Sequence, residues 1–371
     1  MGWLTFSRRH FVCISCRDAA QPLDDRIGLT GSLTEAARRL VSLAGASWAF
    51  GTASRHLKGF CGVAVSGEFI RNVSRAAGKK LTAWMDQSPA AVAPFHRAKG
   101  DVEFETDATT VNTTAGWKDA KIGIFAKRER GESVETKQWD DRKLPAPTAR
   151  FAFARIAECH DFAATWGATA KRLGIDPRSG TLTTLGDGAA WIWDRAAEQF
   201  PGSPGVLDIY HALEYVCDGA KRLFGDGTPE AERFSDRGRE LLLSDGYLGI
   251  TDWVGEMLSA KSKGDGASLG DGASLGGDGA SLGGDGASLG GDGASLGGVL
   301  NYLAGHKDRL NYALRLKRGQ SIGTGMVEGA AKNLIGRRLK ANSARWLIEN
   351  VGPMAGLVSA LYSDCWEPYW N

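Results

Sequence analysis

Residues 185–193 read Leu-Gly-Asp-Gly-Ala-Ala-Trp-Ile-Trp and place Asp187 between two glycines, directly after the apolar strand pattern of residues 180–186. Amphipathic spacing over residues 189–199 predicts a helix next, and the short apolar run at residues 206–209 predicts another buried strand. A strand, a turn, a helix and a second strand in this order are typical of an α/β domain. We therefore expect Asp187 to lie at the rim of a sheet, where its carboxylate is exposed.

Three further strands are predicted upstream of this turn. In residues 102–107, Val, Phe and Thr alternate with Glu, Glu and Asp, which is the pattern of a half-buried strand that ends in Asp107. Residues 117–127 and 151–156 are the second and third candidates. Three strands followed by alternating helices and strands favour an α/β fold with a mixed sheet, and a largely helical tail extends from Gly305 to Tyr369.

The region before these strands is predicted to be helical. Apolar residues have helical spacing over residues 32–80, and residues 53–73 read as a helix, a glycine-containing turn, an N-cap at Ser66 and a second helix. This is the outline of a helix-turn-helix, whose second helix can lie in the major groove of DNA. Many small helical bundles share the outline, so DNA binding and plain packing both remain open on this pattern alone.

The overall composition is that of an ordinary globular protein. The 371 residues include 45 Lys and Arg, 43 Asp and Glu, 43% hydrophobic residues and 24% charged residues. Six cysteines are too few and too unevenly spaced for a disulfide scaffold. No apolar run approaches the roughly 18 residues needed to cross a bilayer, and charge interrupts the apolar start of the chain too early for a secretory signal. We therefore expect a cytoplasmic protein without a membrane partner.

Residues 264–298 are a low-complexity repeat rich in glycine. The motif Gly-Asp-Gly-Ala-Ser-Leu recurs here every six or seven residues and carries five aspartates. A calcium-binding repeat is one interpretation, but the known β-roll has a period of nine residues. Because the segment has no aromatic or β-branched residue, it cannot bury a core, and we interpret it as a flexible insertion in a surface loop. The rest of the chain has 45 basic and 38 acidic residues, a balance that permits a polyanionic partner.

Carboxylates that follow neighbouring strands can meet at one rim of a sheet. Asp107 and Asp187 both end strand patterns, and Asp208 and His211 follow the next strand. Converging carboxylates repel one another and are stabilised by Mg²⁺, and paired ions activate a water or hydroxyl for phosphodiester cleavage. The alternative is that these are solvated turn residues. Glu328 lies near the start of a predicted helix whose basic residues suit phosphate contact: Lys332, Arg337, Arg338 and Lys340.

Several blocks of the chain, taken together and in order, resemble the transposases of the ISKra group of bacterial insertion sequences, relatives of the Mutator-type enzymes. The blocks are PLDDRIGL (22–29), FETDATTVNT…GWKDAKIGIF (104–125), LGDGAAWIW (185–193), FPGSPGVLDIYHALEYV (200–216) and IGTGMVEGAAKNLIGRRLK…RW (322–346). The resemblance runs from about Phe11 to Asn371 and is interrupted by the repeat. It implies an RNase H-like catalytic core whose Asp–Asp–Glu triad falls on Asp107, Asp187 and Glu328.

The resemblance also implies a chemistry and partners. The triad would hold two Mg²⁺ (or Mn²⁺) ions for DNA cleavage and strand transfer at the ends of an insertion sequence, with double-stranded DNA as the partner and a homo-oligomer assembled on paired ends. Asp208 and His211 match the family's Asp-x-x-His block, which supports the active site or contacts DNA. Asp208 is also the alternative candidate for the second triad aspartate. The residues expected to contact DNA are Arg337, Arg338, Lys340 and Arg345.

Two features depart from the family pattern. Members usually carry a second Cys pair ahead of the one that matches Cys13 and Cys16; a four-ligand zinc site needs that pair, so we expect two unpaired surface cysteines. The repeat insertion is the other departure. Together they suggest a shortened or decaying copy, so a catalytically inactive DNA-binding remnant is a second hypothesis, and a host nuclease of the same fold is a third.

The predicted organisation has five parts. They are a Cys-containing remnant (1–31), a helical DNA-binding domain (32–95), the first part of the catalytic core (100–263), the repeat insert (264–298) and a helical region that completes the core (299–371).

Overall fold

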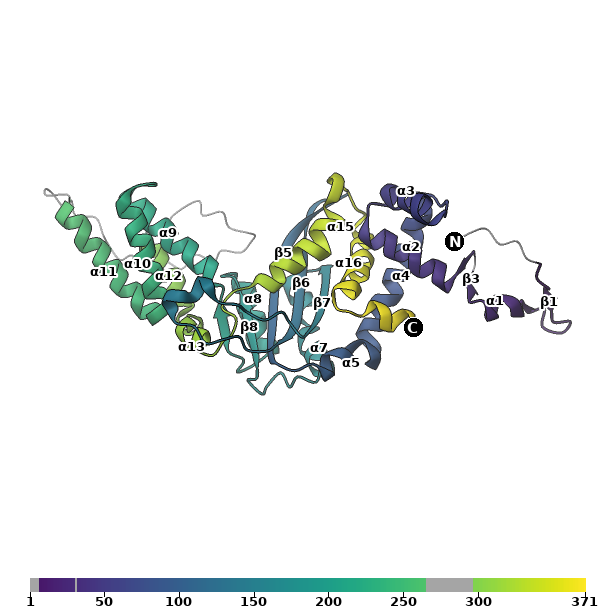
Figure 1. Ribbon diagram of the computed structural model, residues 1–371, viewed down its shortest axis with the longest axis horizontal. Coiled ribbons are helices and arrows are strands. Elements are labelled where there is room, and N and C mark those ends of the chain that lie inside the picture. Colours follow the sequence, from purple (N-terminus) through teal and green to yellow (C-terminus); the bar gives the residue numbers. More distant parts are fainter. Residues whose placement is uncertain (1–6, 31, 265–295) are drawn as a thin grey trace.

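The computed structural model describes residues 7–30, 32–264 and 296–371, and it has an α/β fold around a five-stranded mixed sheet (Figure 1). The strand order is β7-β6-β5-β8-β9. The strands are β5 (Asp101–Thr113), β6 (Gly116–Arg128), β7 (Ala149–Ile156), β8 (Leu182–Gly186) and β9 (Gly205–Leu207). β5, β6 and β7 are antiparallel, whereas β8 and β9 run parallel to β5. The predicted α/β class and mixed sheet are therefore confirmed.

Strand β5 lies in the middle of the sheet, and both of its faces are covered. On one face Phe104 joins a cluster of rings formed with Phe125, Trp166 and Phe200. On the other face Glu103 and Glu105 are also buried, because helix α14 (Gly325–Ala330) packs over them. The prediction of a half-buried strand is therefore wrong. Glu103 is compensated by an ion pair with buried Arg128, whose Nε lies 3.0 Å from the carboxylate.

The N-terminal part of the described chain is mainly helical. It contains two short hairpins, β1 (Phe11–Val12) with β2 (Ala19–Ala20) and β3 (Leu29–Thr30) with β4 (Leu33–Thr34), and the helices α1 (Pro22–Arg26), α2 (Glu35–Ser47), α3 (Phe50–Cys61), α4 (Gly67–Gln87) and α5 (Pro89–Arg97). A small apolar core joins α2, α3 and α4 through Val41, Ala44, Ala53, Leu57 and Ile70.

The turn predicted between two helices is present between α3 and α4. Helix α3 ends at Gly62, whose φ of 66° is a left-handed conformation that favours glycine. Helix α4 begins where the Ser66 hydroxyl accepts a hydrogen bond from the backbone N–H of Phe69 at 3.1 Å. The second half of α4 packs against α16 (Ile348–Tyr362), which joins the helical region to the sheet domain.

Helices also surround the sheet. They are α6 (Cys159–Ala163), α7 (Trp166–Arg172), α8 (Ala190–Gln199), α14, α15 (Arg337–Leu339), α16 and α17 (Trp366–Trp370), with a π-helical turn at residues 331–336. Among the described residues, no helix combines the length and the apolar character that spanning a membrane requires.

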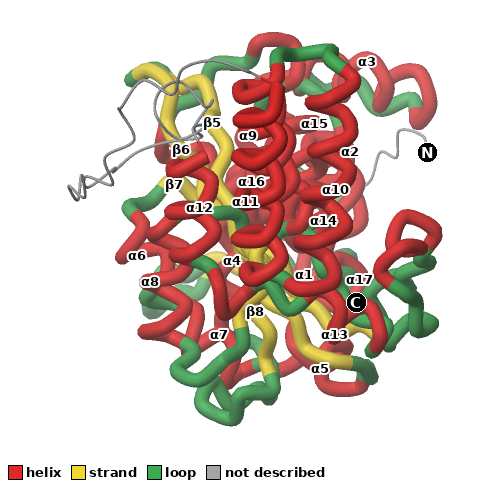
Figure 2. Tube along the Cα trace, turned by 90° about the vertical axis from the view of Figure 1, so that its left-hand side faces the viewer, coloured by secondary structure: helices red, strands yellow, loops and turns green. Residues whose placement is uncertain are grey.

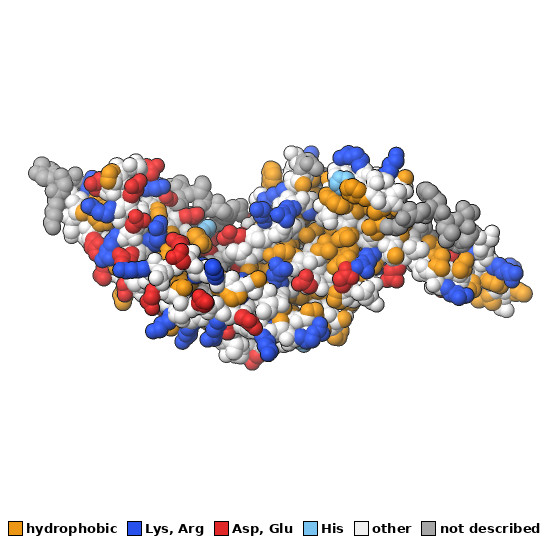
Figure 3. Space-filling model, viewed as in Figure 1, with side chains coloured by type: hydrophobic (Ala, Val, Ile, Leu, Met, Phe, Trp, Pro, Cys, Tyr) orange, Lys and Arg blue, Asp and Glu red, His pale blue; other side chains and the backbone are white. Residues whose placement is uncertain are grey.

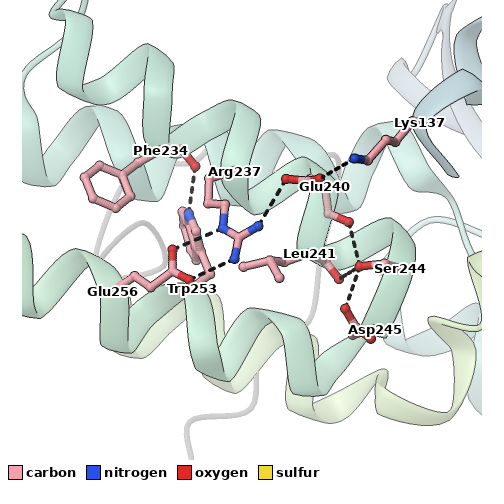
Figure 4. A network of polar contacts seen from close by, with 9 residues as sticks. All are labelled: Lys137, Phe234, Arg237, Glu240, Leu241, Ser244, Asp245, Trp253 and Glu256. Atoms are coloured by element: carbon pink, nitrogen blue, oxygen red, sulfur yellow. Dashed lines mark hydrogen bonds and ion pairs between the residues drawn. The ribbon is translucent and has the colours of Figure 1, made fainter.

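A helical arm, residues 209–317, leaves the sheet after β9 and returns before α14 (Figures 1 and 2). Its helices are α9 (Ile209–Phe224), α10 (Pro229–Asp245), α11 (Tyr247–Gly264), α12 (Leu296–Gly305) and α13 (Tyr312–Lys317). Figure 4 shows the contacts between α10 and α11: Arg237 forms an ion pair with Glu256 at 3.0 Å, and Trp253 Nε1 donates to the Phe234 carbonyl at 2.7 Å. Within α10, Arg237 also contacts Glu240 at 3.1 Å. The predicted repeat insertion falls within this arm, almost entirely outside the described residues.

Candidate active site

The register of two parallel strands places Asp107 and Asp187 side by side. Glu105 of β5 pairs with Leu185 of β8, so each aspartate lies two positions beyond a paired residue. Asp107 is still within β5, whereas Asp187 follows the end of β8. Glu328 lies on α14, the helix that packs over the same face of β5. Three segments that are far apart in the sequence thus bring these carboxylates to one region.

The electrostatics of Asp107 reflect this proximity. Its pKa is raised from 3.8 to about 6, mainly by burial and to a smaller extent by the negative charges of Asp187 and Glu328. The backbone N–H of Ala108, which donates to Asp107 Oδ1 at 2.6 Å, and the nearby His211 act in the opposite direction. The three carboxylates are therefore close enough to repel one another.

Two of the three carboxylates have one oxygen held by a backbone N–H of their own segment, Asp107 by Ala108 and Asp187 by Ala189, the latter at 2.9 Å. Glu328 Oε1 lies 3.4 Å from the Thr324 hydroxyl, whose single proton is donated to Asp208 Oδ2 at 2.7 Å. In the three described ranges, no group of three His, Cys, Asp or Glu side chains is already assembled to hold a metal ion. Three carboxylates supply the hard oxygen ligands that Mg²⁺ or Mn²⁺ prefers, so the chemistry of this donor set fits either ion.

His211 stands beside the triad at the start of α9. Its Nε2 lies 3.8 Å from Asp187 Oδ2, and its Nδ1 lies 3.5 Å from a carboxylate oxygen of Glu214. The side chain is half-exposed, so it can reach a bound molecule as well as Asp187.

Asp208 is buried, with 2% of its surface exposed, and both of its carboxylate oxygens are used. Oδ1 accepts from the backbone N–H of His211 at 2.9 Å, and Oδ2 accepts from the N–H and the hydroxyl of Thr324 at 2.6 and 2.7 Å. The resemblance placed the second triad aspartate on Asp187 and kept Asp208 as the alternative. In the structure the Asp187 carboxylate is partly exposed, whereas the Asp208 carboxylate is buried.

Glu105 is a site residue that the sequence reasoning missed. It is fully buried, and its Oε2 accepts from the backbone N–H of Val327, next to Glu328, at 2.8 Å. Burial and then the charge of Glu103 raise its pKa well above the usual range of a glutamate. The signal that could have found it is the alternation of β5, which puts Glu105 on the same face as Asp107.

The four basic residues expected to contact DNA differ in their accessibility. Arg337, Lys340 and Arg345 are exposed; Lys340 Nζ donates to the Thr109 hydroxyl at 2.7 Å, and Arg345 donates to two carbonyls at the tip of the β5–β6 hairpin. Figure 3 shows Lys and Arg side chains gathered above the sheet and over α3.

The prediction that Arg338 contacts DNA is wrong. Arg338 is 3% exposed, and its Nε donates to the Gly45 carbonyl at 2.6 Å. Its guanidinium lies against the rings of Phe50 and Trp346, at 4.4 and 5.1 Å from their centroids. Burial lowers the pKa of this group to about 10. Arg338 is therefore a structural link between α2 and the C-terminal helices.

Cys13 and Cys16 are both exposed and unpaired, as predicted. Trp193, which follows the Asp187 turn, is buried, and its Nε1 donates to the Asp187 carbonyl at 2.8 Å. This bond helps to fix the backbone of the turn.

The function of this chain is argued from the residues described above, because two comparisons with known proteins found no match. The chain matches no protein-family model, and a search of curated proteins finds no match.

Proposed function

We propose that this protein is a DNA transposase of the Asp–Asp–Glu type, in which Asp107, Asp187 and Glu328 hold two Mg²⁺ or Mn²⁺ ions. The observation that carries the proposal is the register of β5 and β8, which brings Asp107 and Asp187 to neighbouring positions. Glu328 approaches the same place on a helix that is anchored to β5 through Glu105. The order of the sequence blocks around these residues supports the same assignment.

The sheet supports an RNase H-like core. An antiparallel unit, β5 to β7, is followed by two strands that run parallel to β5, and the two aspartates belong to the central pair of strands. The helical arm is inserted between β9 and the helix that carries Glu328. Such an insertion separates the residues of the triad in sequence without separating them in space.

In the proposed mechanism, the residues of the site have different roles. When bound, the ions supply an activated water or 3′-hydroxyl and stabilise the leaving oxygen. Asp107 and Asp187 each keep one oxygen on a backbone N–H, which limits the directions in which the other oxygen can point. Asp208 and Glu105 hold the first turn of α14 and so set the position of Glu328. His211 is placed to contact Asp187 or a DNA phosphate beside it.

The charge distribution supports DNA as the partner. Residues 32–100 contain ten Lys and Arg and only three Asp and Glu, so the basic surplus of the chain is concentrated in the helical region. Arg71, Lys79 and Lys80 are exposed along α4. A long helix with exposed cations is suited to bind the phosphates of a duplex.

A cleavage assay tests the proposal. Duplex DNA that carries the ends of the flanking element is incubated with Mg²⁺ or Mn²⁺ and wild-type protein, Asp187→Ala, Glu328→Ala or the control Asp252→Ala, which changes an exposed carboxylate on α11. We expect cleavage at the ends by wild type and control, and none by the two triad variants. Cleavage that persists in both triad variants would refute the assigned ligands.

A DNA-binding remnant without catalysis is the second candidate. The observation that favours it is that the carboxylates are not assembled for a metal ion in the part of the chain that the structure describes. The same assay separates the two: binding of the element ends without metal-dependent cleavage would support the remnant. Cleavage without joining of the ends to target DNA would instead indicate a nuclease.

A further inference from the structure

The turn that carries Asp187 is in close contact with the helical arm. Gly188 lies so near Tyr302 of α12 that a Cβ atom built at Gly188 would collide with the Tyr302 hydroxyl and with the ring carbons beside it. His306, which follows α12, is hydrogen-bonded to the backbone of Gly188. The second glycine of the Gly-Asp-Gly motif is therefore favoured by a tertiary contact, since any side chain here would displace the side chain of Tyr302.

Tyr302 is held rigidly at this position. Its ring stacks on Tyr215 of α9 with a centroid separation of 3.6 Å and an interplanar angle of 5°, and His306 packs against it edge-on at 5.0 Å. Arg309 donates toward His306 Nδ1 at 2.9 Å and lies over the ring of Trp193 at 4.3 Å. Rings from two helices of the arm and one helix of the sheet domain thus fix the direction in which the Tyr302 hydroxyl points.

The hydroxyl itself is unsatisfied. Tyr302 Oη is buried and has no hydrogen-bond partner among the described residues. A buried polar group without a partner is unfavourable, and an instance beside a candidate active site calls for a functional explanation. One carboxylate whose charge acts on Tyr302 is that of Asp187, one residue from Gly188, and its Oδ2 lies 3.8 Å from His211 Nε2.

We infer that Tyr302 is a positioning residue for Asp187, and this inference rests on the proposed function. The Tyr302 hydroxyl would donate a second hydrogen bond to the Asp187 carboxylate, beside the one from the Ala189 N–H, and so would help to orient the oxygen that a divalent cation would bind. Outer hydrogen bonds of this kind orient ligating carboxylates. The helical arm would then take part in the active site, because Tyr302 of α12 would help to set the direction in which the Asp187 carboxylate points.

The test compares Tyr302→Phe with Tyr215→Phe in the full chain. Both variants keep the ring stack, but only the first removes the hydroxyl that lies over Gly188. Mn²⁺ binding is measured by titration calorimetry without DNA, and thermal unfolding is measured in EDTA. We expect Tyr302→Phe to weaken Mn²⁺ binding by about 10-fold while its unfolding temperature in EDTA stays the same or rises. Tyr215→Phe should bind Mn²⁺ as wild type does.

The outcomes are distinguishable. If wild type binds Mn²⁺ in a way that depends on Asp187 and Tyr302→Phe binds it equally well, the inference is wrong and the proposed function stands. If wild type shows no binding that depends on Asp187, the proposed function and this inference fall together. A loss of Mn²⁺ affinity together with a lower unfolding temperature in EDTA would indicate a packing role and would also overturn the inference.

Discussion

The Asp208 carboxylate joins the start of α9 to Thr324, the residue that precedes α14, across 116 positions of sequence. Oδ2 accepts from the N–H and the hydroxyl of Thr324, and Oδ1 accepts from the N–H of His211. One buried side chain thus caps the helix that carries His211 and holds the helix that carries Glu328. The position of Glu328 depends on Asp208, although both Asp208 oxygens already accept hydrogen bonds and neither is free to bind a metal ion.

Replacing Asp208 should therefore damage both stability and the site. In Asp208→Asn, an amide NH₂ group replaces one carboxylate oxygen. It then faces N–H donors, from which it cannot accept a hydrogen bond. We expect the free energy of unfolding to fall by about 3 kcal/mol, because charged hydrogen bonds are lost in a buried place. Urea unfolding measures this change, and the cleavage assay should show a parallel loss.

The exposed Asp252→Asn is the matched control for Asp208→Asn, and it should change the free energy of unfolding by no more than about 0.5 kcal/mol. If Asp208→Asn were as stable as wild type, the capping role assigned to Asp208 would have to be abandoned.

Asp107→Asn should make the protein more stable at neutral pH in the absence of divalent cations. The pKa of Asp107 is raised from 3.8 to about 6, so its ionised form costs stability above about pH 6, and this cost disappears below about pH 4, where the carboxyl is protonated in both states. Asn carries no charge and still accepts from Ala108. We expect a gain of about 2 kcal/mol in EDTA near pH 7, measured by urea unfolding.

The gain in Asp107→Asn should shrink as the pH falls toward about 4. Added Mn²⁺ should raise the unfolding temperature of wild type more than that of the variant, since only wild type keeps the full carboxylate set. If Asp107→Asn were less stable than wild type at neutral pH in EDTA, the ionised form of Asp107 would not be destabilising, and the prediction would be wrong.

His306 should make the stability of the arm sensitive to mild acid. Burial, followed by the charge of Arg309, lowers its pKa from 6.5 to about 4. Between these values the unfolded chain binds a proton that the native protein does not, so stability falls as the pH decreases from about 6.5 to about 4, by about 3 kcal/mol in total. Urea unfolding of wild type and His306→Gln across this range measures the contribution.

The difference in unfolding free energy between wild type and His306→Gln should decrease steadily as the solution is acidified, because only wild type has this titrating group. His160→Gln, which changes an exposed histidine, serves as the control. A constant difference between wild type and His306→Gln would mean that His306 is not held in its neutral form.

Arg337 and Arg338 are adjacent in sequence and should behave differently. Arg338→Ala leaves the Gly45 carbonyl without its donor and creates a gap beside the rings of Phe50 and Trp346. We expect a loss of about 3 kcal/mol in unfolding free energy. Arg337→Ala should leave stability within about 0.5 kcal/mol of wild type. It should instead weaken duplex binding and reduce the salt dependence of that binding by about one ion.

Fluorescence anisotropy with a labelled duplex from the element end measures the binding of the two arginine variants at several salt concentrations. Weaker DNA binding by Arg338→Ala, with unchanged stability, would show that Arg338 contacts DNA.

Local pattern was sufficient for much of the fold. Alternation with a period of two residues located β5 and its neighbours, and the glycines around Asp187 marked the end of β8. The Ser66 cap identified the start of α4. These features depend on backbone geometry within a few residues, which is why the chain specifies them without reference to its distant parts.

The sequence by itself therefore determined the α/β class, the order of the strands along the chain and the position of Asp187 directly after β8. Its prediction that Asp107 ends a strand is wrong, because β5 continues to Thr113. Only the tertiary structure decided that Glu105 and Arg338 are buried, that Asp208 serves two helices and that Gly188 lies against Tyr302. Each of these outcomes depends on which segment covers a given face. That choice is made by packing between segments that are far apart in the sequence, and residue spacing alone carries no information about it.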